Sequence, residues 1–181
     1  MSEQPGTLTL EHILSQIMAR TAAAIPFDAG GIALYDSATN TLAPKIYVGG
    51  NPKQRKTDPI ALGEGIRGRV AQTRRPILVP DVRQDPHYIH ADQATRSAIA
   101  APLLLDDRLL GVLSLQSNTV NAFTPEHLRT LTALTDQAAI AVDIAIDNAM
   151  RYAREQTRRQ RIERIQAAVQ AISSQVQMHA L

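Results

Sequence analysis

The run Ser97-Ala-Ile-Ala-Ala-Pro-Leu-Leu-Leu105, with Leu109-Leu-Gly-Val-Leu-Ser-Leu-Gln116 after the short link Asp106-Asp-Arg108, decides the fold of this chain. Both runs are almost wholly apolar and have the length of buried strands. Two such runs joined by a short polar link are typical of an antiparallel hairpin. We therefore predict two adjacent strands over 97–105 and 109–116.

The part of the chain before this hairpin predicts further strands and a short helix. Residues 31–35 and 42–48 are apolar or aromatic runs on either side of the turn-rich segment 36–40, which predicts a second strand pair. Residues 63–73 read as a short helix entered through glycines, and residues 77–79 form a brief apolar run between two prolines. Strands and helices together predict an α+β protein.

Two longer helices are predicted at the ends of this region. Apolar residues from Leu10 to Ile25 recur on one helical face, and Pro26 ends that helix. Thr124-Pro-Glu126 is a good helix start, and the second helix is expected to run past Met150. Its polar residues fall on one narrow stripe: Arg129, Thr132, Asp136, Asp143 and Asp147. A helix so widely apolar must be covered on two sides. One side can lie on the sheet, and the other needs a partner, either the first helix or a second copy of the chain.

The last part of the chain predicts a coiled coil. Apolar residues alternate at spacings of three and four: Ile162, Ile165, Val169, Ile172 and Val176. This repeat is one residue out of step with Ala145, Ala149 and Tyr152, so one unbroken coil is not predicted. We expect a homodimer through the helix over 124–164, with residues 10–25 as a further contact. The residues assigned to the dimer helix are Leu131, Leu134, Ala138, Ala145, Ala149, Tyr152, Ile162, Ile165 and Val169.

Composition limits the chemistry that the chain can perform. Of its 181 residues 44% are hydrophobic, 3% are aromatic and none is cysteine, which excludes disulfides, thiolate metal sites and a cysteine nucleophile. No apolar stretch is long enough to span a membrane, so we expect a cytoplasmic protein without membrane contact. Six arginines and two glutamates between residues 151 and 164 outweigh an acidic remainder, which indicates a solvated helix surface rather than nucleic-acid binding.

Three blocks together resemble the GAF domain family over residues 8 to about 152. The first is Gly63-Glu-Gly-Ile-Arg-Gly-Arg-Val-Ala71 with Pro76 and Asp81-Val-Arg-Gln-Asp85. The second is Arg96-Ser-Ala-Ile-Ala-Ala-Pro-Leu103 with Arg108-Leu-Leu-Gly-Val-Leu-Ser-Leu115. The third is Phe123-Thr-Pro-Glu126 with Gln137-Ala-Ala-Ile-Ala141 and Asn148-Ala149. Each block is modest alone, but their order and spacing make the conjunction specific.

The resemblance implies an antiparallel sheet of about six strands, with the first and last helices on one face and a small-molecule pocket under loops and short helices on the other. It implies a regulatory module of a signal-transduction protein, such as a two-component system, over residues 8–152. Residues 153–181 would then be a helical linker toward a histidine kinase, a cyclic-nucleotide enzyme or another GAF domain. We expect reversible binding of an unidentified small molecule, with a ligand-free dimerisation spacer as the alternative.

The candidate binding residues lie in the segment that borders the pocket by this resemblance. They are Asp81, Asp85, His87, Tyr88, Arg96 and Ser97. Arg96 would pair an anionic ligand, Tyr88 would stack on it or donate a hydrogen bond, and Asp85 would accept from an amine or hydroxyl. A structural alternative stays equally open, in which Asp81 and Asp85 cap turns and Arg96 pairs with one of them.

Two other motifs have structural interpretations that we favour. Gly63-x-Gly65-x-x-Gly68 matches a dinucleotide fingerprint, but no strand-helix-strand unit surrounds it. Glycines for a tight helix entry and close packing are therefore favoured over a nicotinamide-dependent enzyme. His87-x-x-His90 lacks an obvious third ligand, so solvated loop histidines are favoured over a metal or haem site.

Other branches of the family fit this chain poorly. The resemblance implies that bilin attachment and methionine-sulfoxide reduction both need cysteine, which the chain lacks. Asn118, Phe123 and Glu126 give a partial echo of the residues that bind cyclic GMP in some members, but Thr119 stands where lysine would follow the asparagine. We therefore predict a non-enzymatic module with no catalytic residue, no metal and no certain cofactor.

Overall fold

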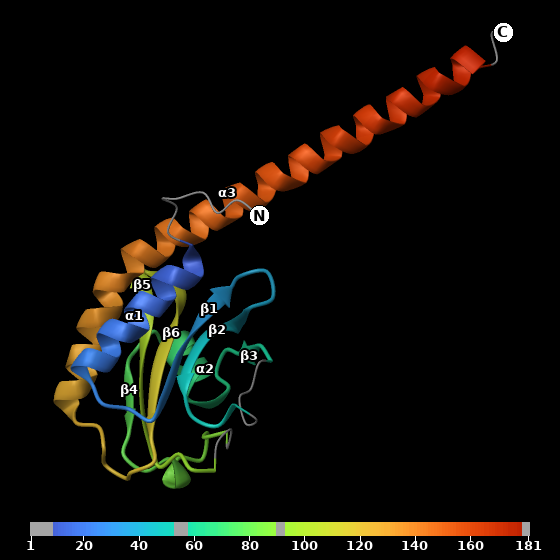
Figure 1. Cartoon of the computed structure of the whole chain (residues 1–181). Coiled ribbons are helices and arrows are strands. Elements are labelled where there is room, and N and C mark those ends of the chain that lie inside the picture. The colour runs from blue at the N-terminus through green and yellow to red at the C-terminus, as the bar shows by residue number, and fades with distance from the viewer. Residues whose placement is uncertain (1–8, 53–57, 90–92, 179–181) are drawn as a thin grey trace. The chain divides into compact units, whose positions relative to one another are not determined.

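Six strands form one antiparallel sheet in the computed structural model of the chain, which describes residues 9–52, 58–89 and 93–178 (Figure 1). The strands are β1 (Ala29–Asp36), β2 (Thr41–Gly49), β3 (Ile60–Ala61), β4 (Ile77–Val79), β5 (Ser97–Leu105) and β6 (Arg108–Ser117). Their order across the sheet is β3-β2-β1-β6-β5-β4, and each neighbouring pair is antiparallel. The predicted α+β class with about six antiparallel strands is confirmed.

The predicted hairpin is β5 and β6. Ser97 pairs with Ser117 at one end of the two strands and Leu105 with Arg108 at the other. In the turn Asp106 has a φ of 52°, a left-handed conformation that aspartate adopts more readily than most residues. Because β6 also pairs with β1, and helices cover the sheet on both faces, the hairpin is buried. This burial explains why its two runs are almost wholly apolar.

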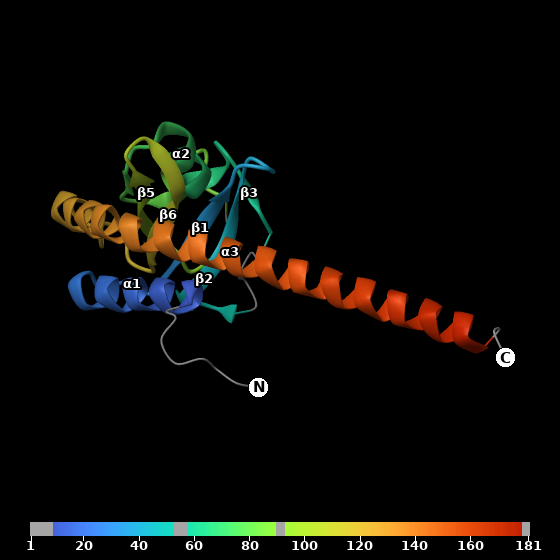
Figure 2. The ribbon, with the colours of Figure 1, turned by 90° about the horizontal axis from the view of Figure 1, so that it is seen from above.

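Two helices cover one face of the sheet and a third covers the other, as Figures 1 and 2 show. α1 (Leu10–Ala24) and the first part of α3 (Pro125–Met178) lie side by side on one face. A Cβ on Gly30 of β1 would lie 2.8 Å from Leu115 Cδ2 and 3.2 Å from Met18 Cε, so Met18 of α1 reaches the sheet at a glycine. The placement of the first and last helices agrees with the expectation.

α2 (Gly65–Thr73) covers the other face of the sheet through an apolar cluster. The cluster consists of Ala33, Leu42, Ile66, Val70, Ala71, Val79, Val82, Ala98, Ala100, Leu109 and Val112. Gly63 and Gly65 have φ of +85° and +60° at the helix entry, and a Cβ on Gly68 would lie 2.3 Å from the Ala61 carbonyl oxygen. The glycines therefore serve a tight turn and close packing. β3 and β4, the strands before and after α2, lie at opposite edges of the sheet, so they are not the parallel strand-helix-strand unit that binds a dinucleotide.

α3 begins as its sequence predicts. The Thr124 Oγ1 accepts a hydrogen bond of 3.2 Å from the His127 backbone N–H, and Pro125 occupies the first helical position. The contacts within the chain divide it into two units, 1–145 and 146–181, and α3 belongs to both. Among the described residues no helix is long and apolar enough to cross a membrane.

Burial corrects part of the assignment of residues to the dimer helix. Leu131, Ala138 and Ala145 are covered by the chain itself, with exposed fractions of 0%, 9% and 2%. Leu134 is half-buried, and the remaining residues with described side chains are exposed: Ala149, Tyr152, Ile162 and Ile165. The side chain of Val169 lies outside the described residues. Leu131, Ala138 and Ala145 therefore belong to the core, and a partner would meet other residues of α3.

Candidate functional site

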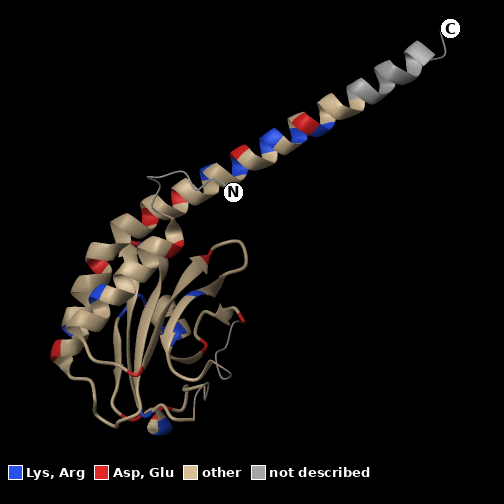
Figure 3. Cartoon of the chain, in the orientation of Figure 1, with Lys and Arg blue, Asp and Glu red and all other residues tan. Residues whose placement is uncertain are grey.

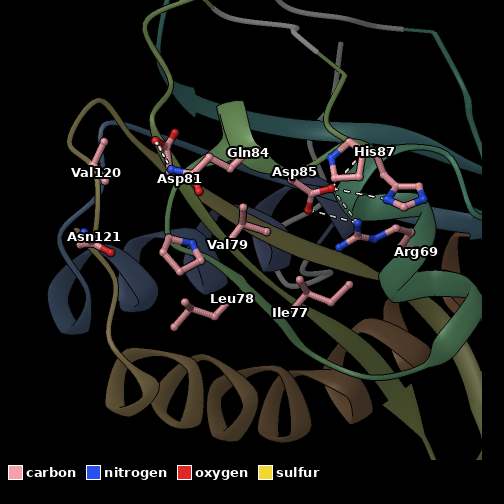
Figure 4. A pocket seen from close by; sticks show the side chains of 12 residues that line it. Arg69, Ile77, Leu78, Val79, Asp81, Gln84, Asp85, His87, Val120 and Asn121 are labelled. Atoms are coloured by element: carbon pink, nitrogen blue, oxygen red, sulfur yellow. Dashed lines mark hydrogen bonds and ion pairs between the residues drawn. The ribbon is translucent and has the colours of Figure 1, made fainter.

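A pocket of about 590 Å³ opens beside the edge strand β4 (Figure 4). It is lined by Arg69, Ile77, Leu78, Val79, Pro80, Asp81, Gln84, Asp85, Pro86, His87, Val120 and Asn121. Asp81, Asp85 and His87 of the predicted site are therefore brought together here. Tyr88, Arg96 and Ser97 do not line this pocket.

Asp81 caps the short 3-10 helix η2 (Val82–Gln84) and pairs with Arg83. Its Oδ1 accepts hydrogen bonds from the Arg83 backbone N–H at 3.1 Å and from Nε at 2.9 Å, and its Oδ2 accepts from Nη2 at 2.7 Å. The hydrogen bonds from the Arg83 side chain are the largest cause that lowers the pKa of Asp81 to about 2. Asp81 is thus an ionised side chain that caps η2 and forms an ion pair with Arg83.

Asp85 is the centre of the polar group in this pocket, as the dashed lines of Figure 4 show. Arg69 Nη1 donates to both carboxylate oxygens, at 2.9 and 3.1 Å. The backbone N–H of His87 donates to Oδ1 at 2.9 Å, and the His87 Nδ1 lies 3.6 Å from the same oxygen. Because each charged side chain lining the pocket already has a partner of opposite sign, the pocket offers little to hold a charged ligand.

The other three predicted residues lie outside this pocket. Tyr88 packs against the apolar cluster beneath α2. Arg96 Nη1 donates to the carbonyl oxygens of Gln93 and Thr95, at 2.6 and 3.0 Å, and buried Ser97 donates to the Thr119 carbonyl at 2.7 Å. Asp81 and Asp85 each accept a hydrogen bond from the backbone N–H two residues later, as in a turn cap, whereas Arg96 donates to backbone carbonyls. Arg83 and Arg69 hold those two carboxylates instead.

No metal site is found in the part of the chain that the structure describes. Among those residues no group of three or more His, Asp or Glu side chains is close enough to hold an ion. His87 is exposed beside Asp85. His90, the second residue of the predicted pair, lies outside the described residues.

A second polar group lies under α2 and was not singled out from the sequence. Arg67 Nε donates a hydrogen bond of 2.6 Å to Ser114 Oγ on β6. Its guanidinium carbon lies 5.9 Å from the centre of the Tyr47 ring, and the Tyr47 hydroxyl donates to Gln116 Oε1 at 3.1 Å. Ser114 pairs with Gly31 on one side and Ala100 on the other, so small residues flank it. We call Arg67, Tyr47, Ser114 and Gln116 the α2 polar group.

The charge of Arg67 has no carboxylate partner among the described residues. Its surroundings are a hydroxyl and an aromatic ring, whereas Arg69, two positions later, pairs with Asp85. Burial lowers the pKa of Arg67 from its usual value, and the phenols of Tyr47 and Tyr88 oppose that shift. An arginine remains a cation in proteins and carries five N–H donors, which suit a carboxylate or phosphate.

Signals for the α2 polar group are present in the sequence. Ser114 and Gln116 are polar residues at alternate positions of an otherwise apolar strand, so both point to the same face of the sheet. Arg67 lies in the glycine motif. Because we interpret that motif as the entry to a helix, the side chain of Arg67 is not singled out by it. The cross-strand register that places Tyr47 and Ser114 on either side of Gly31 is not evident from spacing.

Comparison with known proteins gives a consistent family. A family model for the GAF domain matches residues 7–143. The nitrogen fixation protein VnfA of Azotobacter vinelandii is 28% identical over 124 residues, which are 64% of this chain and 24% of that protein. GAF domain-containing protein A of Dictyostelium discoideum is 33% identical over 64 residues, 35% of this chain and 40% of that protein. The chain thus spans less than half the length of these curated relatives.

Solved structures give the same fold. The GAF domain of a phosphoenolpyruvate-protein phosphotransferase from Coxiella burnetii superposes with a TM-score of 0.69 and 23% identity, over 80% of this chain and 89% of that one. Free methionine-R-sulfoxide reductase from Neisseria meningitidis, in complex with its substrate, has a TM-score of 0.59 and 24% identity, over 76% and 89%. Identities this low establish the fold alone.

Proposed function

The chain belongs to the GAF domain family, and from this premise we propose that it is a non-enzymatic regulatory module that binds a small anionic molecule reversibly. The site is the α2 polar group. Binding is transmitted through α3, which pairs with α3 of a second copy and leads to a covalently linked output domain. The relatives that exceed this chain in length are consistent with such a linked domain.

The observation that carries the ligand proposal is the environment of Arg67. Arg67 is half-buried, and a cation partly withdrawn from water is costly unless an anion or several acceptors compensate it. Within the described residues Arg67 has one hydrogen-bond acceptor, Ser114, and no carboxylate. A carboxylate or phosphate on a small molecule supplies the missing partner, and Tyr47 and Gln116 add polar contacts beside it.

A regulatory role without catalysis is supported by composition. One structural neighbour is a methionine-R-sulfoxide reductase, but this chain contains no cysteine and so lacks the thiolate expected for that branch. The glycine motif serves packing and the sheet is antiparallel, so a nicotinamide-dependent reaction has no support either.

Native mass spectrometry of the protein as purified, combined with thermal unfolding, tests the ligand proposal. We expect wild type to retain a small molecule or to gain melting temperature with succinate, acetate or inorganic phosphate as probes. Arg67→Gln should lose both effects. Arg69→Gln is the matched control, because it lies on the same helix but pairs with Asp85. If Arg67→Gln still retains the small molecule, the proposed site is wrong. If wild type neither retains a small molecule nor gains melting temperature with any probe, the ligand-free spacer is favoured.

A further inference from the structure

We propose that four arginines on one side of the last part of α3 form a docking surface for an acidic helix of a partner protein. They are Arg154, Arg158, Arg161 and Arg164, and we call them the basic face. All four side chains are exposed, and all four lie within the unit of residues 146–181. Figure 3 shows the Lys and Arg residues of α3 in blue and its Asp and Glu residues in red.

The spacing of these arginines places them on one side of the helix. They follow one another at intervals of four, three and three residues, and residues three or four apart are neighbours on a helix surface. At a rise of about 1.5 Å per residue the basic face extends about 15 Å along α3. It is therefore a short, straight row of guanidinium groups about three helical turns long.

The glutamates of this stretch lie around Arg159, on nearly the opposite side of the helix. Arg159 Nη2 lies 2.7 Å from Glu155 Oε1, and Glu163 follows Arg159 by four residues. Glu155 is also three residues before Arg158, but in the structure it pairs with Arg159. Among the described residues no arginine of the basic face has an ion pair, so the charges of this stretch are segregated.

The basic face brings like charges together. Each of its arginines is three or four residues from the next, and such like-charge neighbours weaken a helix. Carboxylates on a partner would replace this repulsion with attraction, because the planar guanidinium group binds a carboxylate through two hydrogen bonds. A partner helix with acids at the same spacings therefore complements the basic face, whereas α3 itself supplies no such acids.

The borders of the basic face favour an acidic helix over a longer polyanion. Asp147 lies on the same side of α3 two turns before Arg154, so a nucleic-acid duplex or an anionic membrane that continued along the helix would meet a negative charge. Ile162 is the one aliphatic residue between Arg154 and Arg164, so this stretch has no broad apolar side to enter a membrane. A second copy that used the same face would place arginine against arginine.

Titration of the full chain with two synthetic acidic peptides, followed by NMR of the arginine Nε–H resonances, tests the proposal. The first peptide is an alanine-based helix with four glutamates at intervals of four, three and three residues. The second has the same composition, with its glutamates spread around the helix. At an ionic strength of about 10 mM, where screening is weak, the first peptide should shift the resonances of the basic face. It should also bind about threefold more tightly than the second, or better.

Two double variants with the same net charge locate the binding surface. Arg158→Gln/Arg161→Gln removes half of the basic face and should weaken binding of the first peptide about threefold or more. Arg20→Gln/Arg129→Gln removes two exposed arginines outside residues 146–181 and should leave the affinity within about twofold of wild type. Circular dichroism shows whether each variant keeps the helix content of wild type.

Three outcomes would overturn the proposal. The first is that neither peptide shifts the resonances of the basic face. The second is that both peptides bind equally well, or that both double variants weaken binding equally, because attraction by net charge alone would then explain binding. The third is that a DNA duplex or vesicles of phosphatidylserine and phosphatidylcholine bind the basic face more tightly than the first peptide does, which would assign this surface to a polyanion.

Discussion

Nε of Arg67 donates a hydrogen bond of 2.6 Å to Oγ of Ser114, which ties α2 to the middle of the sheet. The contact joins the glycine motif to the buried hairpin, the two parts of the sequence that determine how the sheet is covered. It satisfies one of five donors of the guanidinium and leaves the charge without a counter-ion among the described residues. A half-buried cation without a counter-ion lowers stability, and we expect this effect at Arg67.

Replacing this cation should stabilise the ligand-free protein. Arg67→Met keeps much of the length of the side chain and removes the uncompensated charge, so we expect the free energy of unfolding to rise by about 1 kcal/mol. Arg69→Met should instead lower the free energy of unfolding by about 1–3 kcal/mol, because Asp85 loses both hydrogen bonds from the Arg69 guanidinium. Urea unfolding of the two variants measures the difference. Destabilisation by both would mean that Arg67 is a structural residue.

Asp81 should titrate well below an ordinary aspartate. Its pKa is about 2 because Arg83 donates hydrogen bonds to the carboxylate, whereas the usual value is 3.8. At pH values above 3.8 this contact therefore stabilises the folded state, and the stabilisation is lost as the pH falls toward 2. Carbon-detected NMR titration should give that midpoint in wild type and a higher midpoint in Arg83→Ala, where the backbone N–H of residue 83 and Gln84 Nε2 still donate to the carboxylate. The same midpoint in both proteins would exclude Arg83 as the cause.

Gly68 should not tolerate a side chain although it lies inside a helix. Helix propensity favours alanine over glycine by about 1 kcal/mol. A Cβ here would lie 2.3 Å from the Ala61 carbonyl oxygen, and overpacking of this kind costs about 1–3 kcal/mol or more. We expect Gly68→Ala to lower the melting temperature, whereas the exposed Thr73→Ala in the same helix should change it little. A higher melting temperature for Gly68→Ala would show that β3 moves away easily.

The sequence predicts the sheet and helices well because each element carries its own local signal. The alternation of apolar runs and turns identifies β1, β2, β5 and β6, and Thr124 with Pro125 marks the start of α3. The partners of the charged residues were not predictable in this way. Arg69 and Asp85 are brought together by the fold, and Arg67 meets Ser114 47 positions away, so no spacing rule connects them. Which apolar face of α3 meets the sheet also depends on tertiary packing, and Ala145 was misassigned for that reason.

Ile144 and Ala145 are neighbours on α3 that should respond in opposite ways to the same substitution. Ile144 is 55% exposed on α3, the helix proposed to pair with a second copy, so Ile144→Lys should keep the melting temperature and weaken self-association about tenfold or more. Ala145 is 2% exposed in the core, so Ala145→Lys should lower the free energy of unfolding by about 3 kcal/mol or more. Sedimentation equilibrium and thermal unfolding of both variants measure the two effects. If Ile144→Lys still associates as wild type does, the partner lies on another face of α3; if Ala145→Lys unfolds no earlier than wild type, the core does not include this turn of the helix.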